Sequence, residues 1–195
     1  MILLSTVITS MEKELWAFFS TEAHPDMYRY INSAVNYIYN RRDWQWNRTI
    51  YSFSYLSANT EQTLPFFATK IFRAKYNSAL IDVLNNEEWF LADDHTNAIG
   101  VFWDKFIATA TGTYQILYAK PAPSVQSWDT YIDLPDFYID ALQAIAIHYA
   151  YKDIKDYSSA SALIWQANAI LDNVTERTVD TYPRKVTRLW SNHSF

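Results

Sequence analysis

The residues that could do chemistry in this chain are few and far apart. Its four histidines are His24, His95, His148 and His193, and no two of them have the i, i+4 spacing of a helical zinc site. The densest group of possible ligands is Asp93-Asp94-His95, whose carboxylates could hold a hard cation but whose composition is more typical of a polar turn. We therefore expect neither a metal site nor a cofactor.

Spacing gives no support for catalysis either. Glu87 and Glu88 are adjacent, and adjacent side chains of a strand point to opposite faces, so the two carboxylates cannot act together on a substrate there. The chain has no cysteine nucleophile and no Gly-x-Ser-x-Gly elbow, and its two glycines, Gly100 and Gly112, are too few for a glycine-rich phosphate loop. We expect a protein that is not an enzyme, with a hydrolase of distant carboxylates as the weakest alternative.

Aromatic residues are abundant instead: the chain has eight Trp, fifteen Tyr and eleven Phe. Tyr and Trp are enriched at protein interfaces, and this number exceeds what one modest core needs, which indicates association with other protein surfaces. As an alternative, Trp89, Trp103 and Trp128 could be stacking platforms for sugars in a carbohydrate-binding protein.

Charge and hydropathy limit the partners. The net charge of −5 at pH 7 argues against binding nucleic acid over the whole surface. No segment approaches the roughly 20 apolar residues of a membrane span. The N-terminal Met1-Ile2-Leu3-Leu4 has no basic residue before it, so it lacks the charged region of a signal peptide. We expect synthesis in a cytoplasm and no membrane association.

Helical periodicity predicts two helices within residues 6–42. Apolar residues recur at helical spacing over 6–19, and a second helix begins at Pro25, a residue favoured in a first helical turn. The other faces of this second helix are unusually aromatic, which suggests that both sides meet protein. They carry Tyr28, Tyr30, Tyr37 and Tyr39.

Two further helices are predicted within residues 135–174. Pro135, with Asp133 before it to cap and Asp136 in the first turn, indicates the start of the third helix. Either Asp156 or Ser158 can cap the fourth, and the short link before it predicts an antiparallel pair.

Between these helices the pattern is that of strands. Residues 49–55 alternate aromatic and small polar side chains, the period of a strand covered on one side. Similar short runs occur at 70–76, 79–84, 88–91, 113–118 and 128–132. Residues 98–110 are compatible with a helix or another strand.

These elements predict an α+β fold: an antiparallel helical bundle of about four helices, with a small β-sheet or sandwich inserted between the second and third. We expect one domain over residues 1–175, with the β insertion at about 49–132. Residues 176–195 are basic and aromatic in an acidic chain, and we interpret them as an extended C-terminal arm that could pair with a neighbouring acidic surface or with nucleic acid phosphates, with a frayed, solvated terminus as the alternative. The residues expected to make that contact are Arg177, Tyr182, Arg184, Lys185, Arg188 and Trp190.

Several segments together resemble a known family. A helix ends in Arg41-Arg42-Asp43-Trp44 before Trp46 and an aromatic strand. The strand at 112–118 leads to Pro121 and Pro123, and Leu134-Pro135-Asp136-Phe137-Tyr138 opens an alanine-rich helix. In this order of elements, over roughly 25–56 and 111–174, the chain resembles the head-to-tail adaptor (connector) proteins of tailed bacteriophages, with Arg42, Trp44, Trp46 and Pro135 as the structural motif.

The resemblance implies a structural virion protein of the neck. Such proteins form a ring, usually dodecameric, below the portal protein. The ring extends the channel for genomic DNA, without sequence-specific binding, and docks a tail or nozzle protein. The C-terminal segment would reach the portal or an adjacent subunit. Another neck or tail-completion component is the alternative within the same particle.

Overall fold

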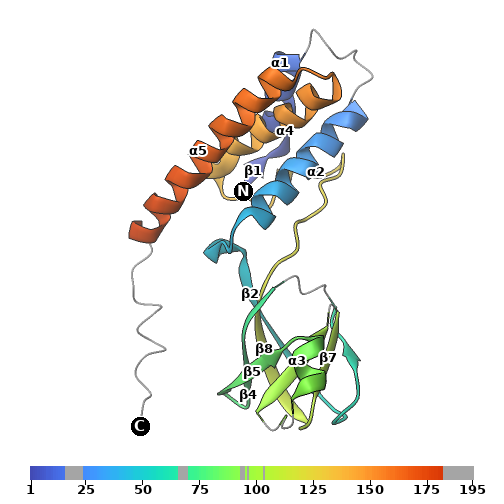
Figure 1. The fold of residues 1–195 in the computed structure, drawn as a ribbon. Coiled ribbons are helices and arrows are strands. Elements are labelled where there is room, and N and C mark those ends of the chain that lie inside the picture. The colour runs from blue at the N-terminus through green and yellow to red at the C-terminus, as the bar shows by residue number, and fades with distance from the viewer. Residues whose placement is uncertain (16–23, 66–69, 93–94, 96, 103, 182–195) are drawn as a thin grey trace. The chain divides into compact units, whose positions relative to one another are not determined.

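The computed structural model describes residues 1–15, 24–65, 70–92, 95, 97–102 and 104–181. The chain divides into two compact units (Figure 1). Unit 1 combines residues 1–38 with the chain from 123 onward, and unit 2 is the continuous segment 39–122. The single domain expected over 1–175 stays a prediction.

Unit 1 is built around a helix that is apolar on nearly every side. This helix, α4 (Ile139–Asp153), buries seven alanine, leucine and isoleucine side chains, so it must be covered by other elements. It packs against α1 (Leu4–Leu15) and α5 (Tyr157–Thr181), and side chains of α2 (His24–Arg41) reach it from a further side. Figure 1 shows the four helices running alongside one another.

Short elements connect the two ends of the chain within unit 1. Strand β1 (Ile2–Leu3) pairs antiparallel with β9 (Tyr131–Ile132), and Ile2 and Ile132 are both buried. Pro135 precedes a single 3₁₀ turn, η2 (Asp136–Tyr138), and α4 follows it. The predicted helix start is therefore displaced by a few residues.

Asp156 is the residue that caps α5. Its carboxylate accepts hydrogen bonds from the Ser159 backbone N–H at 3.1 Å and from the Ser159 hydroxyl at 2.6 Å. These bonds hold the pKa of Asp156 below its ordinary value. The preceding Lys155 has a left-handed backbone (φ 63°), which reverses the chain between the antiparallel helices.

Unit 2 is a mixed sheet of seven described strands, in the order β2-β8-β4-β5-β6-β7-β3. All neighbours are antiparallel except β5 and β6. A 3₁₀ turn, η1 (Gln45–Asn47), precedes the sheet, and a short helix, α3 (Asn86–Leu91), makes the parallel crossover. The strands are β2 (Arg48–Tyr55), β3 (Gln62–Thr63), β4 (Ile71–Tyr76), β5 (Ala79–Leu84), β6 (Ala98–Phe102), β7 (Lys105–Ala108) and β8 (Gly112–Ala119).

Aromatic rings join β2, at one edge of this sheet, to β7, the strand next to the other edge. Phe106 of β7 is fully buried and packs edge-on against Phe53 and Tyr55 of β2, at centroid distances of 4.8 and 5.1 Å. The Tyr55 hydroxyl accepts hydrogen bonds from the backbone N–H groups of Thr60 (3.0 Å) and Ala108 (3.3 Å), and donates to Thr60 O at 2.6 Å. The sheet is therefore barrel-like and nearly closed.

The predicted fold class is wrong in its central feature. The β region is a large mixed sheet with its own core, and not a small sheet or sandwich inserted in a helical bundle. Residues 98–110 form two strands, and residues 88–91 belong to α3, because the Asn85 side chain and Glu88 form a reciprocal cap there. The arm predicted from residue 176 is also wrong as far as Thr181, since α5 continues to that residue.

The Tyr55 hydroxyl should stabilise the closed sheet measurably. Tyr55→Phe leaves two backbone N–H groups without their acceptor, so we expect a loss of about 2 kcal/mol in the free energy of unfolding by urea. The matched control Tyr76→Phe removes one hydrogen bond, to Thr111 O at an exposed position, and should cost less than about 1 kcal/mol. Equal losses in the two variants would contradict this role.

Alkaline pH should weaken the fold through Tyr114. Burial, followed by the nearby Tyr76 and Tyr55, raises the pKa of Tyr114 from 10.0 to about 12. The unfolded chain therefore loses this proton first, so the stabilisation is complete below pH 10.0 and is lost as the pH rises to about 12. We expect Tyr114→Phe to reduce the decline of unfolding free energy over that range by about 2 kcal/mol, measured by urea unfolding at each pH. Tyr131→Phe, at a ring that is 54% exposed, should leave the decline unchanged.

Candidate functional site

Two of the histidines, His148 and His95, make contacts that serve the fold. The Nδ1 atom of His148 lies 2.7 Å from Ala160 O and links α4 to α5. The Nε2 atom of His95 lies 2.7 Å from Trp89 O, and its ring centroid is 4.1 Å from that of Trp89. Within the described ranges no three His, Asp or Glu side chains are grouped to hold a metal ion. Asp93, Asp94 and His193 lie outside those ranges.

The other candidates for chemistry are also dispersed. Glu88 closes the α3 cap by accepting from the Asn85 N–H at 2.9 Å, and both Glu87 and Glu88 are exposed to solvent. A shallow groove along α1 is rich in hydroxyl groups and has one cation and one amide, but no acid beside them. It is lined by Ser5, Thr6, Thr9, Ser10, Lys13 and Gln143.

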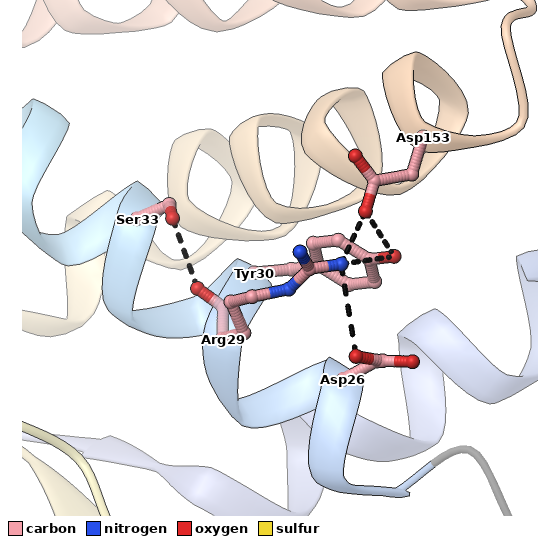
Figure 2. Close-up of polar contacts among 5 residues, drawn as sticks. All are labelled: Asp26, Arg29, Tyr30, Ser33 and Asp153. Atoms are coloured by element: carbon pink, nitrogen blue, oxygen red, sulfur yellow. Dashed lines mark hydrogen bonds and ion pairs between the residues drawn. The ribbon is translucent and has the colours of Figure 1, made fainter.

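A polar cluster joins α2 to the end of α4, and Figure 2 shows Arg29 and Tyr30 meeting the Asp153 carboxylate, with Asp26 and Ser33 in contact with Arg29. The Asp153 carboxylate accepts from the Tyr30 hydroxyl at 2.9 Å and forms an ion pair with Arg29. Arg29 also donates to the Tyr30 hydroxyl at 3.2 Å, and its guanidinium carbon lies 4.9 Å from the centroid of the Tyr30 ring. Its guanidinium is 3.6 Å from the Asp26 carboxylate. Ser33 donates to Arg29 O at 3.0 Å.

Electrostatics identify this cluster as a clamp between helices. The hydrogen bond to Tyr30 and the charge of Asp153 raise the pKa of Arg29, and burial raises the pKa of Tyr30. A general base must be able to take up a proton near neutral pH, and the raised pKa values of Arg29 and Tyr30 lie further from neutral pH than their ordinary values. The arrangement stabilises a helix contact.

The predicted motif residues have structural positions. Trp44 is buried, Trp46 stacks on it at 6.4 Å, and Tyr39 meets Trp46 edge-on at 5.0 Å. These rings fix the passage from the end of α2 to β2. Arg42 is exposed beside them, and Pro135 fixes the entrance of η2 at φ −60°.

The predicted C-terminal contact residues are not brought together by the structure. Arg177 falls within α5, where the backbone alone is described. The other five lie outside the described residues: Tyr182, Arg184, Lys185, Arg188 and Trp190.

Unit 1 has two separate areas of exposed apolar side chains. The first, here called the terminal patch, consists of Met1, Leu3, Tyr131 and Phe137. Leu3 and Tyr131 are opposite each other across the β1–β9 pair, and an ion pair of 2.9 Å between the Met1 amino group and Asp136 holds the N-terminus near Phe137.

The second area, here called the α5 face, contains Tyr157 and Trp165, which are 61% and 76% exposed. They lie about two turns apart on the same helix, with exposed small residues between them. Sequence reasoning missed both areas as surfaces. Trp165 lies on the side of α5 opposite to the buried Ala160, Ala167 and Leu171, and a large ring on that side was the available signal.

Three of the tyrosines on α2 meet protein within this chain. Tyr30 and Tyr39 are buried within their own units, and the Tyr37 hydroxyl donates to Asn168 of α5 at 2.8 Å. Much of the aromatic excess therefore fills cores. The exposed rings among the described residues are Phe90, Trp128, Tyr131, Phe137, Tyr157 and Trp165.

No protein-family model matches the chain, and no curated protein matches its sequence. None of the helices in the described part combines the length and apolar character that crossing a bilayer requires.

The Arg29–Asp153 ion pair of the clamp should add a small, salt-dependent amount to the free energy of unfolding. Arg29 and Asp153 side chains are 58% and 45% exposed, and ion pairs at such positions stabilise by about 0.2–1 kcal/mol. A double-mutant cycle with Arg29→Gln and Asp153→Asn should give a coupling energy in that range by urea unfolding. It should shrink in high salt, and a coupling that is zero at low salt would contradict the clamp.

Proposed function

We propose that this chain is a structural virion protein, a head-to-tail adaptor that forms a ring below the portal of a tailed bacteriophage, extends the DNA channel and docks the tail. It acts without catalysis, at the head–tail junction. A dodecamer is the expected ring.

The observation that carries this proposal is the pair of unlike apolar areas on unit 1. A ring with one kind of interface requires two different, complementary surfaces on every subunit, whereas a twofold dimer requires one surface that matches itself. The terminal patch and the α5 face contain different residues and come from different elements. We propose that the terminal patch of one subunit binds the α5 face of the next.

Resemblance supplies the second support. The motif around Trp44 and Trp46 anchors a helix end to the first long strand, and Pro135 precedes the central helix, in the order in which the family resemblance has them. In this proposal residues 182–195 bind the portal protein, with Tyr182, Arg184, Lys185, Arg188 and Trp190 as the contact residues and Arg177 at the end of the helix that leads to them.

The carbohydrate-binding alternative has weaker support. Trp89 is half-buried and stacked on His95, so its ring is not an open platform, and Trp103 lies outside the described residues. Trp128 is 78% exposed, but sugar sites of this kind usually need several polar partners around the ring.

Ring assembly can be tested with variants that block one side each. Trp165→Glu places a charge on the α5 face and Tyr131→Glu places one on the terminal patch, so each variant alone should sediment as a monomer. An equal mixture retains one intact interface and should form a heterodimer but no ring. Phe90→Glu, at an 82% exposed position of unit 2, is the matched control and should assemble as the unmodified chain does.

Sedimentation velocity distinguishes the outcomes. A mixture that stays monomeric, or an unmodified chain that is monomeric at all concentrations, would contradict the heterologous ring. Circular dichroism of each variant checks that the helices are retained.

Portal docking requires a separate experiment. Removal of residues 182–195 leaves α5 complete, so the truncated chain should still form rings but should lose binding to the portal ring of the same phage, measured by cosedimentation. Unchanged portal binding would reject the role of these residues.

A further inference from the structure

One face of the sheet in unit 2 is basic although the whole chain is acidic. The three adjacent strands β2, β8 and β4 contain no aspartate or glutamate. Their inward side chains, such as Tyr55, Tyr114 and Ala74, are in the buried core. The alternate positions point outward and include Arg48, Arg73 and Lys75, a set called here the basic face.

Strand register places hydrogen-bonding side chains between these cations. Gln115 of β8 lies opposite Ser52 of β2 on one side and opposite Lys75 of β4 on the other. Because β8 separates β2 from β4, cations on the two outer strands are about 10 Å apart across the face. The basic face is thus a surface of cations, hydroxyl groups and an amide, and it also includes the apolar Ile50 and Leu117 in the row of Arg73.

Aromatic contacts orient the cations at one end of this face. The Arg48 guanidinium lies 4.3 Å from the centroid of Phe72, and Lys70 lies 5.6 Å from the same ring. Asp43 forms an ion pair with Lys70, and its backbone carbonyl accepts from Arg48 at 3.4 Å. Phe72 therefore supports two long basic side chains and reduces the conformational freedom that binding would remove.

The described acidic residues of unit 2 lie outside these three strands, although Asp43, which precedes β2, is paired with Lys70 at one end of the basic face. Asp82 is in β5, Glu87 and Glu88 are in α3, and Glu61 is paired with Lys105 at 2.6 Å near β3 and β7. A uniformly solvated surface would mix both signs, so this separation indicates a partner of negative charge.

We propose that the basic face binds the sugar–phosphate backbone of duplex DNA. Arg, Lys, Ser, Thr and Gln are the side chains that contact phosphate oxygens, and this face presents them without an element that could enter a groove to read bases. Binding is independent of sequence and weak at physiological salt, which permits DNA to slide. The inference deepens the proposed function, on which it rests for the identification of the DNA as the phage genome.

The test is fluorescence anisotropy of a labelled random-sequence duplex with the full chain, titrated between about 50 and 200 mM NaCl. The triple variant R48Q/R73Q/K75Q removes three positive charges from the basic face. The control K13Q/K152Q/K155Q removes three from exposed positions of unit 1. Thermal unfolding of both variants confirms that they are folded.

We expect the face variant to bind DNA at least about ten-fold more weakly at the lowest salt, and its log–log salt slope to fall by about 2.7 in magnitude, the value for three lost phosphate contacts. The control should change affinity less than about two-fold.

Equal weakening in both variants, an unchanged salt slope, or no DNA binding by the unmodified chain would overturn the proposal. Loss of self-association in the face variant, with DNA binding retained, would assign the face to a second copy instead. Ring formation is read separately, so either proposal can fail alone.

Discussion

The packing of Phe106 against Phe53 and Tyr55 is the interaction on which unit 2 depends. These rings come from β2, at one end of the seven-stranded order, and from β7, next to the other end, and their contact makes the sheet nearly closed. The Tyr55 hydroxyl adds direction to this packing, because it pairs with backbone groups of both β7 and the segment after β2. Without this closure the aromatic inner side would be open to water.

Closure of the sheet also determines which side chains of β2, β8 and β4 face solvent. Once the aromatic side chains of β2, β8 and β4 are enclosed, the alternate positions of the same strands must all face solvent. The strict alternation in β2 therefore sorts aromatic from polar side chains, and the outer surface collects cations without acids. An acidic chain can in this way present a locally basic surface, which its net charge conceals.

Local signals in the sequence were sufficient for many elements. The alternation over residues 49–55 and the apolar runs at 70–76 and 79–84 correspond to β2, β4 and β5, and Pro25 lies at the start of α2. These elements carry their period within a few residues. The capping residue of α5 was likewise one of two predicted from hydrogen-bonding side chains.

The sheet itself could not be predicted because its pairing is not local. β6 and β7 are short, and Gly100 lies within β6 where an added Cβ would come within 2.6 Å of Phe102 and 2.7 Å of Ile107, so a small residue marks tight packing and weakens the strand pattern. The parallel β5–β6 pair depends on α3, which connects the two strands. The sequence of α3 resembles a strand, and the residue that starts it as a helix is the N-cap Asn85, which pairs reciprocally with Glu88. The exposed residues on unit 1 were equally hidden, because exposure of Leu3 and Tyr131 follows from a strand pair between distant segments.

The division of the chain has a consequence for its synthesis on the ribosome. Unit 2 is one uninterrupted segment, so it can acquire its complete set of strands soon after β8 emerges. Unit 1 needs the first helices and the last ones together, and the β1–β9 pair cannot form until the intervening segment has been translated. The apolar sides of α1 and α2 therefore stay exposed to solvent during most of translation. Chaperone binding or premature aggregation would act on this partly translated chain.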